Sequence, residues 1–190
     1  MRLPLTAAIA CLAILGAGCN KQPKTDELNA SNETVGADSN GAATTAAAAL
    51  GSADFANAIA GGGRFEIESA ALAATKASSA DVKSLAAQIS ADHKKAGEDL
   101  KAAAAASSPP FTPLASLNAK QKTDLDALKG PTGAEFDRLY ASQQIASHQE
   151  AVQLLTSYAA GGASPQLKDF AAKVLPTVQG HLDRLSALPR

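Results

Sequence analysis

The chain has 190 residues, which is enough for one domain with additional segments. Its formal net charge is −1 and aromatic residues make up 4% of it, so neither a basic surface nor a stacking platform for nucleic acid is expected. Much of the 46% hydrophobic content is alanine, which favours helices and lets them approach closely. The composition predicts a helical protein with a thin core and no nucleic-acid partner.

The first 19 residues, MRLPLTAAIACLAILGAGC, have the form of a bacterial secretion signal. Arg2 precedes an apolar run that ends near Leu15 and is too short to span a membrane comfortably. Small residues then lead to Cys19, as in a lipobox, although Gly16 stands three places before the cysteine. We therefore expect a signal peptide over 1–18 and lipidation of Cys19, with ordinary signal cleavage nearby as the alternative.

A lipidated Cys19 predicts a protein of the bacterial cell envelope whose partner is a membrane. Asn20 follows the cysteine in place of the aspartate that resembles an inner-membrane retention signal. We therefore expect a periplasmic protein tethered to the outer membrane. The other cysteine, Cys11, lies inside the signal, so neither a disulfide framework nor a thiolate metal site is expected in the folded part.

Residues 19–51 predict a disordered polar tether. The segment is rich in Asn, Thr, Ser, Gly and Ala and has no apolar period. Such a composition cannot bury enough surface to offset the entropy of ordering the chain. The folded domain is therefore expected over 52–190.

From residue 53 onward the apolar residues recur with a helical period, without the alternation of strands. The pattern predicts four long helices, with a short one in the middle connection, over 53–76, 80–106, 118 to about 129, 134–160 and 165–188. Together they predict an all-α, up-and-down four-helix bundle. Gly61–Gly63 and Pro176 are expected to kink their helices, or in the first case to split it.

Three residue patterns indicate where helices begin. Ser79 and Ser164 are expected N-caps, and Pro165 stands at the favoured first position of the last helix. Asn118 with Gln121 three residues later forms a capping-box pattern.

The three histidines of the chain all fall on the apolar faces of their helices. His93 follows Ile89 by four residues, and His148 and His181 are placed in the same way on their helices. Glu66 shares the apolar face of the first helix. The charged neighbours of His93 are expected to turn away from the centre of the stripe; they are Asp92, Lys94, Lys95 and Asp99.

Counted from the turns, Glu66, His93, His148 and His181 lie near one level in mid-bundle. Neutral imidazoles and one carboxylate suit a single transition-metal ion such as Zn or Fe. A buried Glu–His hydrogen-bonded network without metal is the alternative reading, and a coincidence of faces is the third.

Two further residues are candidates for a supporting role beside the site. Asp137 lies on the side of His148 with Tyr140 close by. Asp137 is expected to hydrogen-bond to the end of a neighbouring helix or to line an access path.

The motifs F-E-I-E, D-H, F-D-x-x-Y with a later H-Q, and L-P-x-x-x-x-H-L run through residues 52–188. In this order they resemble the bacterial envelope family catalogued as domain of unknown function 4142. The resemblance implies a ferritin-like bundle exported to the periplasm, often as a lipoprotein, with no established activity. Ferritin-like di-iron sites use Glu-x-x-His pairs, but Ser90, Ile145 and Val178 stand three places before the histidines. A single-metal or metal-free site is therefore more consistent than a di-iron site.

No catalytic motif appears in the sequence: G-x-S-x-G, the P-loop, the dinucleotide fingerprint and H-E-x-x-H are all missing. One functional hypothesis is therefore a metal-binding envelope protein with a role in metal handling or stress. The alternative is a metal-free structural or interaction module of the envelope. An enzyme is expected only if a bound metal keeps an open coordination position.

Overall fold

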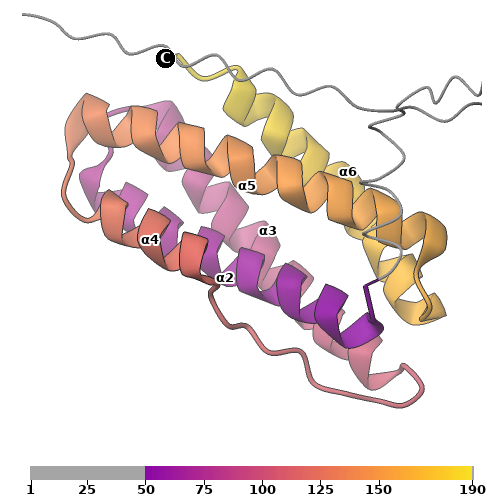
Figure 1. Ribbon diagram of the computed structural model, residues 1–190. Helices are drawn as coiled ribbons and strands as arrows, with labels where there is room; N and C mark the ends of the chain where they lie inside the picture. Colours follow the sequence, from indigo (N-terminus) through magenta and orange to yellow (C-terminus); the bar gives the residue numbers. More distant parts are fainter. Residues whose placement is uncertain (1–49, 190) are drawn as a thin grey trace, which may run out of the picture. The chain divides into compact units, whose positions relative to one another are not determined.

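A computed structural model describes residues 50–189 of the protein (Figure 1). The predicted signal peptide, Cys19 and nearly all of the tether lie outside the described residues. This part of the chain is all-helical; its elements are α2 (Ser52–Lys76), α3 (Ala80–Ala105), α4 (Ala119–Leu128), α5 (Gly133–Gly161) and α6 (Pro165–Ser186). None of the described helices is both long enough and apolar enough to cross a membrane.

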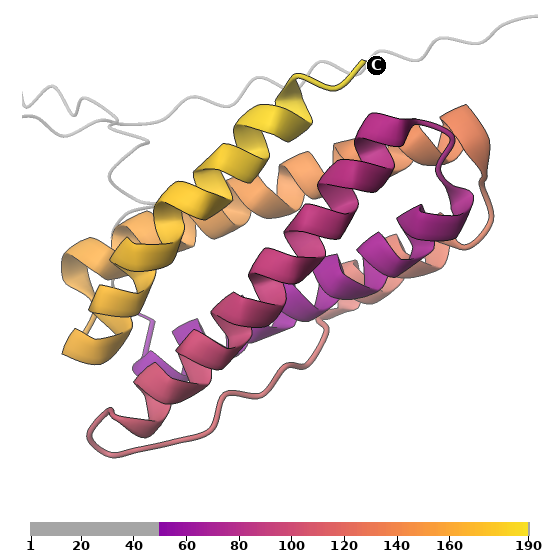
Figure 2. The same cartoon turned by 180° about the vertical axis from the view of Figure 1, so that it is seen from behind.

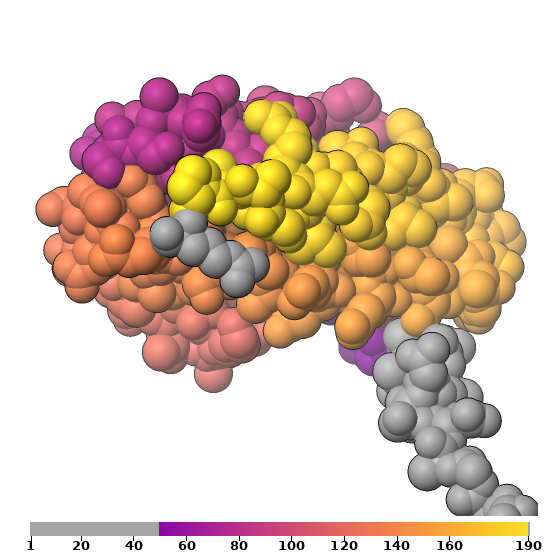
Figure 3. All heavy atoms as spheres, turned by 90° about the horizontal axis from the view of Figure 1, so that it is seen from above, coloured from indigo at the N-terminus to yellow at the C-terminus, as the bar shows by residue number. Residues whose placement is uncertain are grey.

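The four long helices pack as a bundle in which neighbouring helices run antiparallel (Figures 1 and 2). The main pairs are α2 with α3 and α5 with α6, and contacts of α3 with α6 and of α2 with α5 complete the ring. In the space-filling view α6 and α5 lie side by side on one face (Figure 3). This is the predicted ferritin-like four-helix bundle.

The middle connection, which contains α4, runs along α2. The backbone N–H of Leu114 donates to Asn57 Oδ1 at 2.7 Å, near the start of α2. Lys76 Nζ, in the last turn of α2, donates to the carbonyl oxygen of Lys129 at 2.7 Å, just after α4. The connection therefore returns the chain over the length of the bundle, and α3 and α5 run in the same direction. The up-and-down order expected from the sequence would have alternated these two helices, and the long crossover replaces that alternation here.

The helix starts follow the expected caps. Ser79 Oγ accepts from the N–H of Val82, and Ser164 Oγ accepts from the N–H of Leu167. Asn118 and Gln121 form the predicted capping box.

Helix α2 is continuous through Gly61–Gly63, so the possible split does not occur. Gly61 is required by a close approach, since a Cβ added there would lie 2.6 Å from the carbonyl oxygen of Ser116 in the middle connection. The first of the three glycines thus lets the connection lie against α2.

A polar layer around Glu66 divides the interior into two halves. We call the half that contains residues 69–76 of α2 the packed half. A buried cluster fills it, comprising Ala70, Ala73, Ala77, Val82, Ala86, Leu128, Phe136 and Tyr140. We call the half that contains residues 52–63 of α2 the pocket half. A buried cluster at its far end includes the stacked rings of Phe55 and Tyr158, whose centroids lie 3.8 Å apart.

Candidate metal centre

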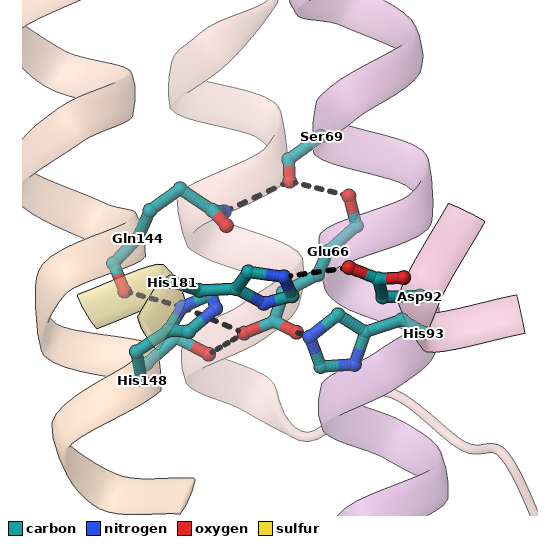
Figure 4. Close-up of polar contacts among 8 residues, drawn as sticks. Glu66, Ser69, Asp92, His93, Gln144, His148 and His181 are labelled. Atoms are coloured by element: carbon teal, nitrogen blue, oxygen red, sulfur yellow. Dashed lines mark hydrogen bonds and ion pairs between the residues drawn. The ribbon is translucent and has the colours of Figure 1, made fainter. Parts of the chain in front are cut away.

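His93 of α3, His148 of α5 and His181 of α6 point toward one another in the middle of the bundle (Figure 4). One ring nitrogen of each can be chosen so that the three atoms lie within 4.8 Å of one another. The ring centroids are 5.5 to 5.7 Å apart. Helical phase and height thus bring together the three histidines named from the sequence, and their role as metal ligands stays a prediction.

Glu66 reaches this cluster from α2. Its carboxylate is buried, with Oε2 lying 2.6 Å from His93 Nε2 and Oε1 lying 3.2 Å from His148 Nδ1. Ser147 Oγ donates to Oε1 at 2.9 Å. Glu66 contacts two histidines but does not belong to the donor set within 4.8 Å, which consists of the three imidazoles.

Hydrogen bonds fix the tautomers of two of the histidines. His148 Nδ1 lies 2.9 Å from the carbonyl oxygen of Gln144, which can only accept, so Nδ1 carries the hydrogen. His181 Nε2 lies 2.9 Å from Asp92 Oδ2 and donates to it in the same way. The bare nitrogens, Nε2 of His148 and Nδ1 of His181, are then available as ligands, and bonds of this kind orient ligand histidines in metal sites.

Within residues 50–189, four buried atoms of the cluster have no hydrogen-bond partner: Glu66 Oε2, His93 Nε2, His148 Nε2 and His181 Nδ1. The close approach of Glu66 Oε2 to His93 Nε2 brings opposite charges together without the geometry of a hydrogen bond. Buried polar atoms without partners are costly and rare in folded proteins. A cation between them would satisfy several of these atoms at once.

The charge states follow from burial and contacts. Burial alone would raise the pKa of Glu66, but the charges of His93 and His148, together with the hydrogen bond from Ser147, outweigh it and lower that pKa to about 2. Burial would lower the pKa of His93, yet Glu66 beside it raises that pKa overall. Burial lowers the pKa of His148 and of His181 below the ordinary value. In the metal-free cluster Glu66 is therefore a carboxylate paired with a protonated His93. His148 and His181 are neutral imidazoles, which is the form of histidine that binds metals.

A second set of polar contacts braces the layer on the side of the packed half. Ser69 Oγ donates to the carbonyl oxygen of Glu66 at 3.1 Å, and Gln144 Nε2 donates to Ser69 Oγ at 2.9 Å. Gln144 thus holds α5 to α2 while its carbonyl oxygen orients His148.

The two supporting candidates lie on the side of the packed half. Asp137 accepts from the backbone N–H groups of Ser78 and Ser79 at 3.1 and 2.9 Å, so it binds the start of α3, the first of the two roles expected for it. Tyr140 is fully buried and stacks on Phe136, and burial with the nearby charge of Glu66 raises its pKa. Its hydroxyl has no hydrogen-bond partner in the described residues.

Asp92 corrects the expectation that it turns away from the site. Its carboxylate bonds to His181, because a flank position on α3 faces α6 across the helix boundary. Sequence reasoning also missed Ser147 and Gln144. The available signal was spacing, since Asp92 and Ser147 precede histidines and Gln144 stands one helical turn before His148.

Three pockets meet at His93 and Ala96. Pocket A, of about 160 Å³, lies between α3 and α6. Pocket B, of about 380 Å³, is lined mainly by α2, α5 and α6. Pocket C, of about 450 Å³, is lined by α2, α3 and the middle connection. His93 is also the most exposed of the three histidines, with 12% of its side chain accessible, so the centre is nearest to solvent there.

Comparison with known proteins gives a family and a fold. The family model described as domain of unknown function (DUF4142) matches residues 37–188. A solved structure titled "CopM in the Cu(II)-bound form" superposes with a TM-score of 0.61 and 20% sequence identity, covering 72% of this chain and 94% of that chain. At that identity the likeness shows a shared helical fold. No curated protein sequence matches the chain.

Proposed function

The chain belongs to the DUF4142 family, and we propose that it binds one transition-metal ion between His93, His148 and His181. The observation that carries the proposal is the convergence of three buried imidazoles from three helices, two of which, His148 and His181, offer bare nitrogens at Nε2 and Nδ1. Glu66 Oε2 and His93 Nε2 lie 2.6 Å from each other, whereas the bare nitrogens of His148 and His181 have no hydrogen-bond partner in the described residues.

Glu66 supplies the negative charge that a divalent ion needs in a buried site. Its Oε2 atom, which lies 2.6 Å from His93 Nε2 and has no partner with hydrogen-bond geometry in the described residues, is the proposed fourth donor beside the three imidazoles. Its Oε1 atom stays bonded to Ser147. Binding of the ion at His93 Nε2 requires that this nitrogen lose its proton, so uptake of the ion releases a proton.

Copper(II) is the ion that we propose, and zinc and iron, expected from the donor types, serve as comparisons. Nitrogen and oxygen donors bind copper(II) more tightly than the other divalent first-row ions. The helical neighbour in the copper-bound form supports this choice. Metal handling in the cell envelope is the proposed role, with Cys19 lipidated and residues 19–51 as the tether to the membrane.

The test is metal stoichiometry of the purified protein without a polyhistidine tag. Calorimetric titration with copper(II), zinc and iron(II) should give one site, tightest for copper. His148→Ala should weaken copper binding by about 100-fold or more, because loss of a ligand exceeds the loss of an outer partner. Gln149→Ala, an exposed neighbour on α5, is the matched control and should bind like the wild type.

A metal-free structural module is the second candidate, and the 2.6 Å approach of Glu66 to His93 favours it. In that case the protein would be fully folded without metal. Addition of copper(II) or zinc would leave its melting temperature unchanged, because an ion that does not bind the native state cannot stabilise it.

A further inference from the structure

The three pockets that meet at His93 differ in charge. Pocket A carries two carboxylates and two ammonium groups, and Asp99 is paired with Lys95 and Lys173 at 3.1 and 3.0 Å. Pocket C carries three cations against two carboxylates, from Arg64, Lys94, Lys101, Glu68 and Glu98. Pocket B carries the carboxylates of Glu66 and Glu150, and neither lysine nor arginine lines it.

Pocket B also connects the surface to the candidate centre. Glu150 is exposed on α5, and Glu66, at the inner wall, is 2% exposed with an unpartnered carboxylate oxygen. Ser147 also lines the pocket, and its hydroxyl donates a hydrogen bond to Glu66. The nearby cation, Lys120, is paired with Asp124 at 2.7 Å and does not line the pocket.

Three glycines leave the α2 side of pocket B without side chains. Gly61, Gly62 and Gly63 all line it, and a Cβ added at Gly62 would meet nothing within 4 Å. His93⁺ lines all three pockets, and among them pocket B alone keeps a net negative charge. A cavity of net negative charge with apolar walls concentrates cations. In pockets A and C the lysine and arginine side chains already equal or outnumber the carboxylates before His93⁺ is counted, so neither gives a divalent ion this attraction.

We infer that pocket B is the entry route for the metal ion, with Glu150 as the outer carboxylate that attracts the ion and Glu66 and His93 as the groups that receive it. This inference rests on the proposed function, since it concerns loading of the same centre. It assigns to Glu150 an effect on the rate of uptake and not on the final affinity, because the residue lies at the surface, outside the ligand set.

The experiment is stopped-flow loading of copper(II), followed by quenching of tyrosine fluorescence, which is available because the chain has two tyrosines and no tryptophan. Glu150→Gln should lower the association rate constant by about fivefold at low salt, as expected for one carboxylate acting on a divalent ion across several ångström. The difference should shrink as salt rises. Glu98→Gln, which removes a carboxylate from pocket C, is the matched control and should leave the rate unchanged.

Gly62→Leu tests the route by volume, since Gly62 lines pocket B and a Cβ added there meets nothing within 4 Å, so a larger side chain has space to extend along the pocket. It should slow loading and leave stoichiometry at one ion, with folding checked by circular dichroism. An unchanged rate in Glu150→Gln, or an equal slowing in Glu98→Gln, would overturn the route while the equilibrium titration still supports the centre. A wild-type protein that binds no copper in that titration would overturn the proposed function and the route together.

Discussion

In the packed half α2 presents Ala70 and Ala73 to the interior, and the rings of Phe136 and Tyr140 fill the space opposite them. In the pocket half the same helix presents Gly61–Gly63, and pockets B and C lie along it. Backbone and helix type do not change between the halves. The difference comes from side-chain volume along α2.

The difference shows how a short bundle combines stability with access. Side chains in the packed half interdigitate, and the contacts of Ser69 and Gln144 hold the polar layer from that side. On the other side the layer borders space, and His93 is the histidine that lines it. The packed half also holds a pocket, of about 320 Å³ between α5 and α6, but none of the three histidines lines it. The openings to the candidate centre therefore lie in the pocket half.

The largest expected effect is a loss of stability when a large buried side chain of the packed half is truncated. Phe136→Ala removes a fully buried ring and should lower the free energy of unfolding by about 3–5 kcal/mol, since it adds a cavity to the lost burial. Urea denaturation measures the loss. Copper affinity of the folded variant should stay at the wild-type value, and a comparable fall in affinity would show that the halves are not separable.

The next effect concerns acid stability of the metal-free protein. The pKa of Glu66 is lowered from 4.5 to about 2, so its stabilising contribution is complete above pH 4.5 and is lost as the pH falls through 2. Glu66→Gln should remove roughly 3 kcal/mol of this pH-dependent stability. Urea denaturation curves recorded from about pH 6 to about pH 2 would show a shallower decline of the free energy of unfolding in the variant. Equal slopes would mean that Glu66 is not held as a carboxylate.

The polar layer around Glu66 also shows what could and could not be predicted from the sequence. Helical phase was enough to place Glu66 and the three histidines in one layer, because the period of an α-helix fixes which residues share a face. Phase could not place Asp92, which lies on the flank of α3, because the partner of a flank residue depends on how neighbouring helices pack. The pockets could not be predicted from the sequence for the same reason. The three glycines indicated a low helix propensity in α2, but they did not indicate open space beside that helix.

Asp92 gives a smaller effect, on affinity. Asp92→Ala should weaken copper binding by about 10-fold, at the low end for outer partners of ligand histidines, because its side chain is 37% exposed. Asp92→Asn keeps an acceptor for His181 and should lie between the variant and the wild type. Asp99→Ala, on the same rim of pocket A, is the control in the titration. Equal affinities for all four proteins would mean that Asp92 does not orient His181.

The smallest expected effect separates two adjacent glycines of the pocket half. Alanine is favoured over glycine in a helix by about 1 kcal/mol, and a Cβ at Gly62 meets nothing within 4 Å, so Gly62→Ala should raise the free energy of unfolding by up to that amount. At Gly61 the same atom would lie 2.6 Å from the backbone oxygen of Ser116, which moves only if the middle connection moves. Gly61→Ala should therefore lower stability despite the same gain in helix propensity. Urea denaturation of the two variants tests this opposition of sign. If both variants gained stability, the middle connection would not lie against α2 as described, and the wall of pocket B would be differently built.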